Sequence, residues 1–174
     1  MICLYNDVKF KNVIPLHDKN FQEILRFYLF GCPVAGVSYS ADTFEQLGWK
    51  KESFSTLKSK MLKAASPDLK VNYFPCKKEE LEKRFQQMEK LATSKEFCVF
   101  LKHDETRIMD SLYSAIRNAL AHGSFTLKKA NKKYIYFFAN YDVYLKAQIR
   151  LHEETLLNWV KIVKNGPYPS GQKG

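Results

Sequence analysis

Apolar positions that recur with helical spacing divide the chain into a series of predicted helices. The clearest early example spans residues 77–94, where charged residues separate the apolar ones. Four apolar side chains follow one another there at intervals of four, three and three: Leu81, Phe85, Met88 and Leu91. This spacing places them on one face of a helix, which is expected to pack against a core. Weaker patterns predict further helices over residues 21–30, 42–48 and 51–64.

The most regular pattern of the chain lies between residues 104 and 123. One stripe of helical period is apolar and consists of Ile108, Leu112, Ala115, Ile116 and Ala119. A second stripe lies opposite and is polar: Arg107, Ser111, Ser114, Asn118 and His122. Residues 104–106 provide an N-cap oxygen and acidic side chains for the start of a helix, and Gly123 is typical of the residue that ends one. The pattern predicts an amphipathic helix that ends with a histidine in its last turn.

The segments on either side of this helix complete a predicted fold that is mainly α. Residues 97–101 are expected to be an apolar connector that prolongs the helix backward. Residues 124–127 and 134–139 resemble the two strands of a hairpin, and a final helix is expected from Asp142 to about Lys164. The predicted architecture is a single helical domain of about five helices with one small hairpin. Residues 1–70 form its less certain N-terminal part, and residues 165–174 form a loose tail.

The composition favours one folded domain in a reducing compartment. The chain has 174 residues, of which 45% are hydrophobic, and it includes 13 Phe and 10 Tyr, enough to build a core. The four cysteines are far apart and form no metal-binding pair, so they are expected to be reduced core thiols, with no metal ion and no cofactor. No secretory signal and no apolar run of membrane-spanning length is present, which favours a cytoplasmic protein. The cysteines are Cys3, Cys32, Cys76 and Cys98.

A net charge of +10 favours an acidic partner, and RNA is the obvious candidate. Four lysines stand close together between the two predicted strands: Lys128, Lys129, Lys132 and Lys133. They are candidates for contacts with the RNA backbone. The alternative, that they form a solvated hairpin tip, stays open, because a lysine-rich surface also occurs in proteins that bind no nucleic acid.

The chemistry of the chain is concentrated in residues 117–123. Arg117 and His122 stand five positions apart, Asn118 follows the arginine, and Gly123 follows the histidine. An arginine can stabilise a phosphate, and a histidine can transfer protons near neutral pH. This combination suits cleavage of an RNA phosphodiester without a metal. The alternative is a helix end at which the histidine interacts with the last carbonyls and Arg117 pairs with Asp110.

This motif resembles the signature of the HEPN superfamily, in which an arginine is followed after four to six residues by a histidine. Here four residues separate Arg117 from His122, and Asn118 is the polar residue often found directly after the arginine. The resemblance extends over about residues 75–164. It is nearest to bacterial HEPN proteins of plasmid, toxin or phage-defence type, and it implies a HEPN-like helical bundle.

The resemblance further implies a metal-independent endoribonuclease that acts as a homodimer with a composite active site. Arg117 and His122 would be catalytic. Asn118 would orient His122 or the phosphate, or else bridge the dimer. An antitoxin or regulatory protein would be a further partner, and no membrane would be involved. HEPN toxins silenced by a nucleotidyltransferase antitoxin carry a tyrosine two positions after the histidine. Ser124 stands there in this chain, so control of that kind is not expected.

Two other classes of function remain open at the level of the sequence. One is a catalytically inactive HEPN-like dimer that binds RNA or a partner protein. The other is an antitoxin or immunity partner, which would associate tightly with another protein and cleave nothing. The presence of both Arg117 and His122 favours the enzyme, because a scaffold would not need both residues.

Overall fold

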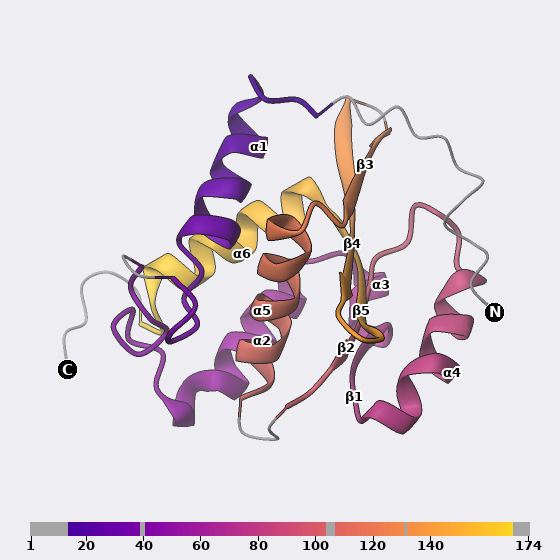
Figure 1. The fold of residues 1–174 in the computed structure, drawn as a ribbon. Coiled ribbons are helices and arrows are strands. Elements are labelled where there is room, and N and C mark those ends of the chain that lie inside the picture. The colour runs from indigo at the N-terminus through magenta and orange to yellow at the C-terminus, as the bar shows by residue number, and fades with distance from the viewer. Residues whose placement is uncertain (1–13, 39–40, 104–106, 131, 169–174) are drawn as a thin grey trace.

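A mixed β-sheet forms the centre of the molecule (Figure 1). The structure is a computed structural model that describes residues 14–38, 41–103, 107–130 and 132–168. In this part of the chain the strand order is β1-β2-β5-β4-β3; β1 is parallel to β2, and all other neighbours are antiparallel. The strands are Tyr73–Cys76 (β1), Phe97–Leu101 (β2), Phe125–Ala130 (β3), Lys133–Tyr141 (β4) and Leu145–His152 (β5).

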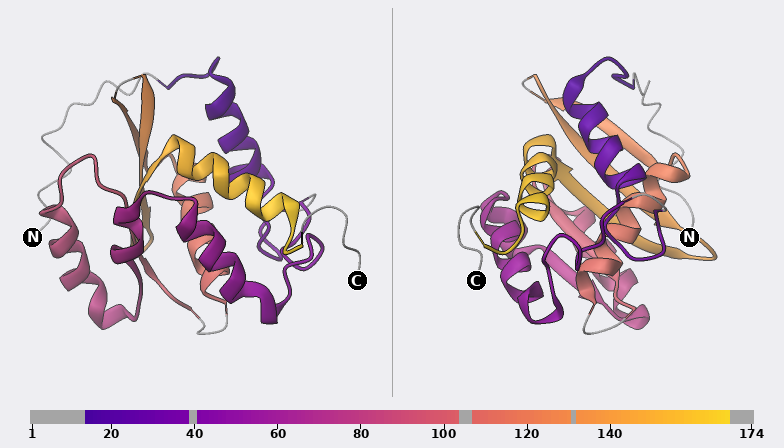
Figure 2. Two further views of the ribbon diagram at one scale, coloured as in Figure 1. Left: turned by 180° about the vertical axis from the view of Figure 1, so that it is seen from behind. Right: turned by 90° about the vertical axis from the view of Figure 1, so that its left-hand side faces the viewer.

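Helices lie on both sides of this sheet (Figures 1 and 2). The larger group, which includes α1, α2, α5 and α6, covers one face, and α4 covers part of the other. Two cores result, a large one under the first group and a smaller one under α4. The α-helices are Lys19–Ile24 (α1), Phe54–Lys63 (α2), Pro67–Val71 (α3), Lys78–Glu89 (α4), Ile108–Ala121 (α5) and Glu153–Asn165 (α6). A π-helical segment, η1 (Leu25–Phe30), continues α1, and a short 3₁₀ turn, η2 (Lys51–Ser53), precedes α2.

The prediction of a mainly α fold, a HEPN-like helical bundle, is therefore wrong. One reason is the segment predicted to prolong the motif helix, which is β2, an interior strand of the sheet. Cys98 and Phe100 belong to the large core, and their neighbours Phe97 and Val99 belong to the core under α4. A strand that is buried on both faces has a continuous apolar run, and such a run cannot be told from a buried connector or helix by its pattern.

The second reason is the segment predicted as the first half of the last helix. Asp142 caps no helix; it lies in the turn between β4 and β5, and α6 begins only at Glu153. The apolar residues Leu145 and Ile149 are four apart, a spacing that fits one face of a helix, but in β5 Leu145 packs against the core under α4 and Ile149 belongs to the large core. β5 inserts between β2 and β4, so residues 147–150 pair with a strand on each side. The pairing of this segment with β2 and β4, and not its local spacing, therefore makes it a strand.

Several other predicted elements are confirmed. The hairpin exists as β3 and β4, with strands longer than predicted, and helices occur within residues 77–94, 51–64 and 21–30. Asp18 caps α1, since its carboxylate accepts hydrogen bonds from the backbone N–H groups of Asn20 and Phe21. The helix predicted over residues 42–48 is wrong, because this segment forms turns. The predicted helix start at residues 104–106 lies outside the described residues.

Candidate functional site

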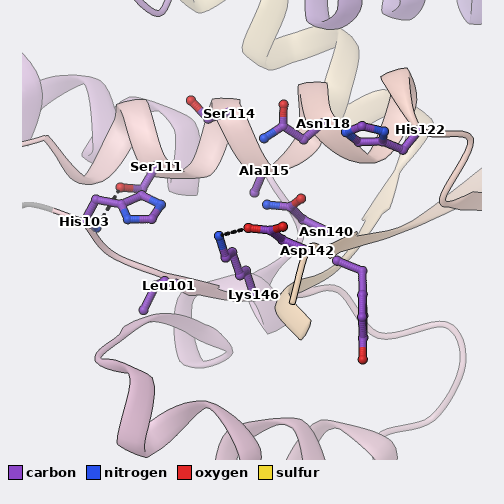
Figure 3. Close-up of a pocket in the computed structure, with 11 residues that line it drawn as sticks. Leu101, His103, Ser111, Ser114, Ala115, Asn118, His122, Asn140, Asp142 and Lys146 are labelled. Atoms are coloured by element: carbon purple, nitrogen blue, oxygen red, sulfur yellow. Dashed lines mark hydrogen bonds and ion pairs between the residues drawn. The ribbon is translucent and has the colours of Figure 1, made fainter. Parts of the chain in front are cut away.

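The polar stripe of α5 lines a cavity at the surface (Figure 3). Most of the helix is buried, because its apolar stripe faces the large core through residues such as Leu112, Ile116 and Ala119. The opposite stripe faces the cavity. Four of its five predicted members line it: Ser111, Ser114, Asn118 and His122. The predicted amphipathic helix therefore presents its polar residues to one shared space.

The cavity has a volume of about 230 Å³ and is enclosed by three parts of the chain. The α5 helix forms one wall. The end of β2 contributes Leu101 and His103, and the turn between β4 and β5 closes the opposite side (Figure 3). The residues from that turn are Asn140, Tyr141, Asp142 and Lys146. The lining is mostly polar, which suits a charged or hydrogen-bonding ligand better than an apolar one.

His122 is held at the mouth of this cavity by the way in which α5 ends. It is the C-cap residue of the helix, and its side chain is exposed. The next residue, Gly123, has a φ of +66°, a left-handed conformation that glycine adopts without strain. The backbone N–H of Ser124 donates to the carbonyl of Ala119 at 2.8 Å, and that of Gly123 donates to Leu120 at 3.2 Å. This pair of bonds is a Schellman motif, and it fixes the direction in which His122 leaves the helix.

Across the cavity, Asp142 and Lys146 form an ion pair with an Oδ2–Nζ distance of 2.6 Å. The hydrogen bond from Lys146, followed by its positive charge, lowers the pKa of Asp142 below the ordinary 3.8. The charge on His122 lowers the pKa of Asp142 by a smaller amount. Asp142 and His122 therefore lie near enough for their charges to interact across the cavity.

His103 is a second histidine of this cavity. Its backbone N–H donates to Oγ of Ser111 at 3.2 Å, which ties the end of β2 to the first turns of α5. The sequence pattern favours a surface histidine at this position, and the side chain is indeed exposed. It also lines the same space as His122, although it lies at the far end of it (Figure 3). Ser111 and His122 are eleven helical positions apart, about 16 Å along the axis.

Arg117 does not line the cavity. Its Nη1 donates a hydrogen bond to Oδ1 of the neighbouring Asn118 at 3.2 Å, and its Nε is buried without a hydrogen-bond partner among the described residues. The guanidinium lies close enough to Cys32 to oppose the effect of burial, which raises the pKa of that thiol to about 11. Of the predicted catalytic residues, the structure thus brings Asn118 and His122 together in the cavity and connects Arg117 to them through Asn118.

The four lysines of the hairpin lie at the other end of β4. Ala130 pairs with Lys133 at that end, whereas Asn140 and Tyr141 reach the cavity at the opposite one. Eight strand positions between Lys133 and Tyr141 correspond to about 27 Å. All four side chains are exposed, and Lys133 forms an ion pair with Glu154 at 2.7 Å. The hairpin lysines therefore do not belong to the cavity.

Six cavity residues come from outside the motif helix, and the sequence predicts a role in the site for none of them: Leu101, His103, Asn140, Tyr141, Asp142 and Lys146. Asp142 was assigned to a helix cap that does not exist. The one feature of the sequence that links two of these residues is the four-residue spacing of Asp142 and Lys146. This spacing is equally typical of an ion pair on a helix, so it does not indicate a cavity.

Other kinds of site have less support in the described residues. Within residues 14–38, 41–103, 107–130 and 132–168, no group of three or more His, Cys, Asp or Glu side chains is arranged to hold a metal ion. Cys32, Cys76 and Cys98 are buried and form no disulfide with one another, while Cys3 lies outside the described residues. No helix in the described part of the chain is both long and apolar enough to cross a membrane.

Comparisons with protein-family models, with curated proteins and with solved structures find no match to this chain. The resemblance to the HEPN superfamily therefore depends on the motif residues of α5, and the observed sheet departs from the helical bundle that this resemblance implied.

Proposed function

We propose that the chain is a metal-independent endoribonuclease whose active site is the cavity at the end of α5. The observation that carries this proposal is the position of His122. Its imidazole is exposed at a polar cavity, next to Asn118 on the same helix face and within electrostatic range of Asp142. A histidine that solvent and substrate can both reach is suited to proton transfer.

In the proposed reaction the 2′-hydroxyl of one nucleotide attacks the adjacent phosphorus. A new bond forms between O2′ and phosphorus, and the bond from phosphorus to O5′ breaks. The products are a 2′,3′-cyclic phosphate and a 5′-hydroxyl. His122 accepts the proton of the 2′-hydroxyl or donates a proton to the leaving O5′. In a homodimer, the same histidine of a second copy would take the complementary role.

Arg117 and Asn118 are proposed to stabilise the charge that develops on the phosphoryl oxygens. Because a guanidinium only donates hydrogen bonds, the bond from Arg117 holds Oδ1 of Asn118 in place and leaves the amide NH₂ group of Asn118 available as a donor. In this arrangement Asn118 contacts the substrate directly, and Arg117 reaches it by a change of side-chain rotamer or acts through Asn118. The cellular role that fits best is a toxin or defence effector, with an antitoxin or regulatory protein as partner.

A second candidate is a HEPN-like dimer that binds RNA or a partner protein and is catalytically inactive. The position of Arg117 favours it, because the guanidinium of the motif lies outside the cavity that His122 lines. The two candidates make opposite predictions for RNA cleavage.

The deciding experiment is cleavage of RNA by the purified protein in EDTA, with analysis of the product ends. For the enzyme, we expect cyclic phosphate and 5′-hydroxyl ends, and their loss in His122→Ala. His17→Ala is a matched control, since His17 is exposed and lies outside the cavity. RNA binding without cleavage would favour the binding module, and equal cleavage by wild type and His122→Ala would reject this site.

A further inference from the structure

The cavity contains a cation that the motif does not include. Lys146 lines the space that His122 lines, whereas the guanidinium of Arg117 lies outside it. The Lys146 side chain is 24% exposed, so most of it is covered by protein while the ammonium group still faces the cavity (Figure 3). A partly covered cation attracts an anion more strongly than a freely solvated one, because less water screens it.

We propose that Lys146, held in position by Asp142, binds a phosphate group of the RNA next to His122. This inference rests on the proposed function, and it adds to that function a substrate-contacting residue outside the motif helix.

The position of Lys146 is fixed by its backbone as well as by its partner. It lies at the start of β5, where Ala147 pairs with Asn140 and Leu145 pairs with Tyr141. Asp142 belongs to the other arm of the same turn, so the ion pair closes the turn across its mouth. A lysine ammonium has three N–H donors, and Asp142 accepts one of them. The ammonium also lies 5.7 Å from the centre of the Tyr144 ring, and the donors that do not face Asp142 can reach phosphate oxygens.

The Asp142 carboxylate does not exclude an anion from this place. Lys146 neutralises it at 2.6 Å, and the Asp142 side chain is 63% exposed, so water screens the remaining charge. A protonated His122 and Lys146 together would give the cavity two positive charges against one negative charge, which suits one phosphodiester.

Two RNA probes of the same sequence test this proposal. One is an all-RNA oligonucleotide for cleavage, and the other carries 2′-deoxynucleotides throughout, so that it binds but offers no attacking hydroxyl. We expect Lys146→Gln to lower kcat/KM by about 100-fold, the effect typical of one lost charge-stabilising donor. Its affinity for the deoxy probe should fall, with the slope of log K against log salt reduced by about 0.7. Lys146→Arg should keep most of both properties.

Lys164→Gln is the matched control, because Lys164 forms a similar ion pair with Glu23 at 2.8 Å and lies outside the cavity. It should behave as wild type, and the thermal unfolding of the two Gln variants should agree. If the wild type cleaves no RNA but binds the deoxy probe in a manner that depends on Lys146, the nuclease proposal fails and the phosphate site stands. If Lys146→Gln cleaves and binds as well as wild type, the phosphate site is overturned and the nuclease proposal stands. Failure of the wild type to bind the deoxy probe overturns the phosphate site as well.

Discussion

Arg117 and Asn118 act on one another directly, since Nη1 of the arginine donates a hydrogen bond to Oδ1 of the asparagine at 3.2 Å. Only Asn118 of this pair lines the cavity with His122. If Arg117 acts by holding Asn118, removing both side chains should lower kcat/KM no more than removing either one. We expect Arg117→Ala and Asn118→Ala each to lower kcat/KM for RNA by about tenfold, and the double variant to be no worse.

A matched pair on α4 provides the control for this cycle. Arg84 donates to Oε1 of Gln87 at 2.9 Å on an exposed face, away from the cavity. Substitution of both by alanine should leave cleavage unchanged. Independent, additive losses for Arg117 and Asn118 would contradict the positioning role and favour direct contact of both residues with the substrate.

Gly123 connects the stability of the fold to the position of His122. Gly123→Ala introduces a side chain at a φ of +66°, which should cost about 1 kcal/mol of unfolding free energy. Gly36→Ala should cost a similar amount, because Gly36 has a φ of +77° and neither site has an atom near the added methyl group. Only Gly123→Ala should also reduce cleavage, since it disturbs the helix end that orients His122. Equal activity of the two variants, measured beside thermal unfolding, would argue against that role.

The hairpin lysines should contribute to the binding of long RNA and not to the binding of short RNA. From the register, Lys128 lies opposite Ile135, six strand positions from Tyr141, or about 20 Å from the cavity. Stacked nucleotides advance by about 3.4 Å each, so an RNA strand would need about six nucleotides to reach both places. We expect Lys128→Gln with Lys129→Gln to weaken binding of a 20-nucleotide RNA and to leave a trinucleotide substrate unaffected. Equal effects on both lengths, or none on either, would show that these lysines do not bind the RNA backbone.

The charge on Asp142 should shift the pH dependence of cleavage. Its pKa is lowered, chiefly by Lys146, so the stabilising ion pair is present above the ordinary carboxylate pKa and is lost as the pH falls through the lowered value. Histidine is the side chain whose unperturbed charge changes between about pH 5 and 8. Removal of the nearby negative charge disfavours an imidazolium. Asp142→Asn should therefore move the midpoint of the pH profile of kcat/KM to lower pH. A midpoint that stays in place or moves upward would contradict this electrostatic coupling.

Glu96 should be among the most sensitive positions for stability. Its side chain is fully buried, and its carboxylate accepts hydrogen bonds from the backbone N–H of Ser66 at 2.9 Å and of His152 at 2.7 Å. Glu96→Ala leaves both N–H donors without this acceptor and should lower the free energy of unfolding by about 3 kcal/mol. Urea unfolding followed by the fluorescence of the buried Trp49 and Trp159 measures this change. The exposed Glu89→Ala is the control, with an expected change near zero; a similar loss in both variants would refute the assignment.

The helix with the motif could be predicted because all the information for it is local. Its apolar stripe, its polar stripe and Gly123 lie within about 20 consecutive residues, and the structure bears out the amphipathic arrangement. The strands β2 and β5 could not be predicted in the same way. Leu145 and Ile149 have the spacing of one helix face, and only the pairing of the segment with β2 and β4 makes it a strand.

The residues of the candidate site also fall into those that local sequence predicts and those that it does not. Asn118 and His122 were predicted from their place on one helix, whereas His103 and Lys146 reach the cavity from β2 and β5. Their proximity depends on the strand order, which the spacing of residues along the chain does not contain. The error in the fold and the omission in the site have one physical cause, the long-range pairing of strands.

The hydrogen bonds at the C-terminal end of α5 should limit the motion of the backbone next to the site. Helix ends usually open more readily than helix centres, but here Ser124 is bound on both sides. Its N–H donates to Ala119 in the helix, and its carbonyl accepts from the N–H of Ala139 in β4 at 2.9 Å. The amide of Ser124 should accordingly exchange its hydrogen with solvent slowly, unlike an amide in a frayed terminus. His122 is thus ordered before any ligand arrives, and the entropy lost in ordering its backbone belongs to folding rather than to binding.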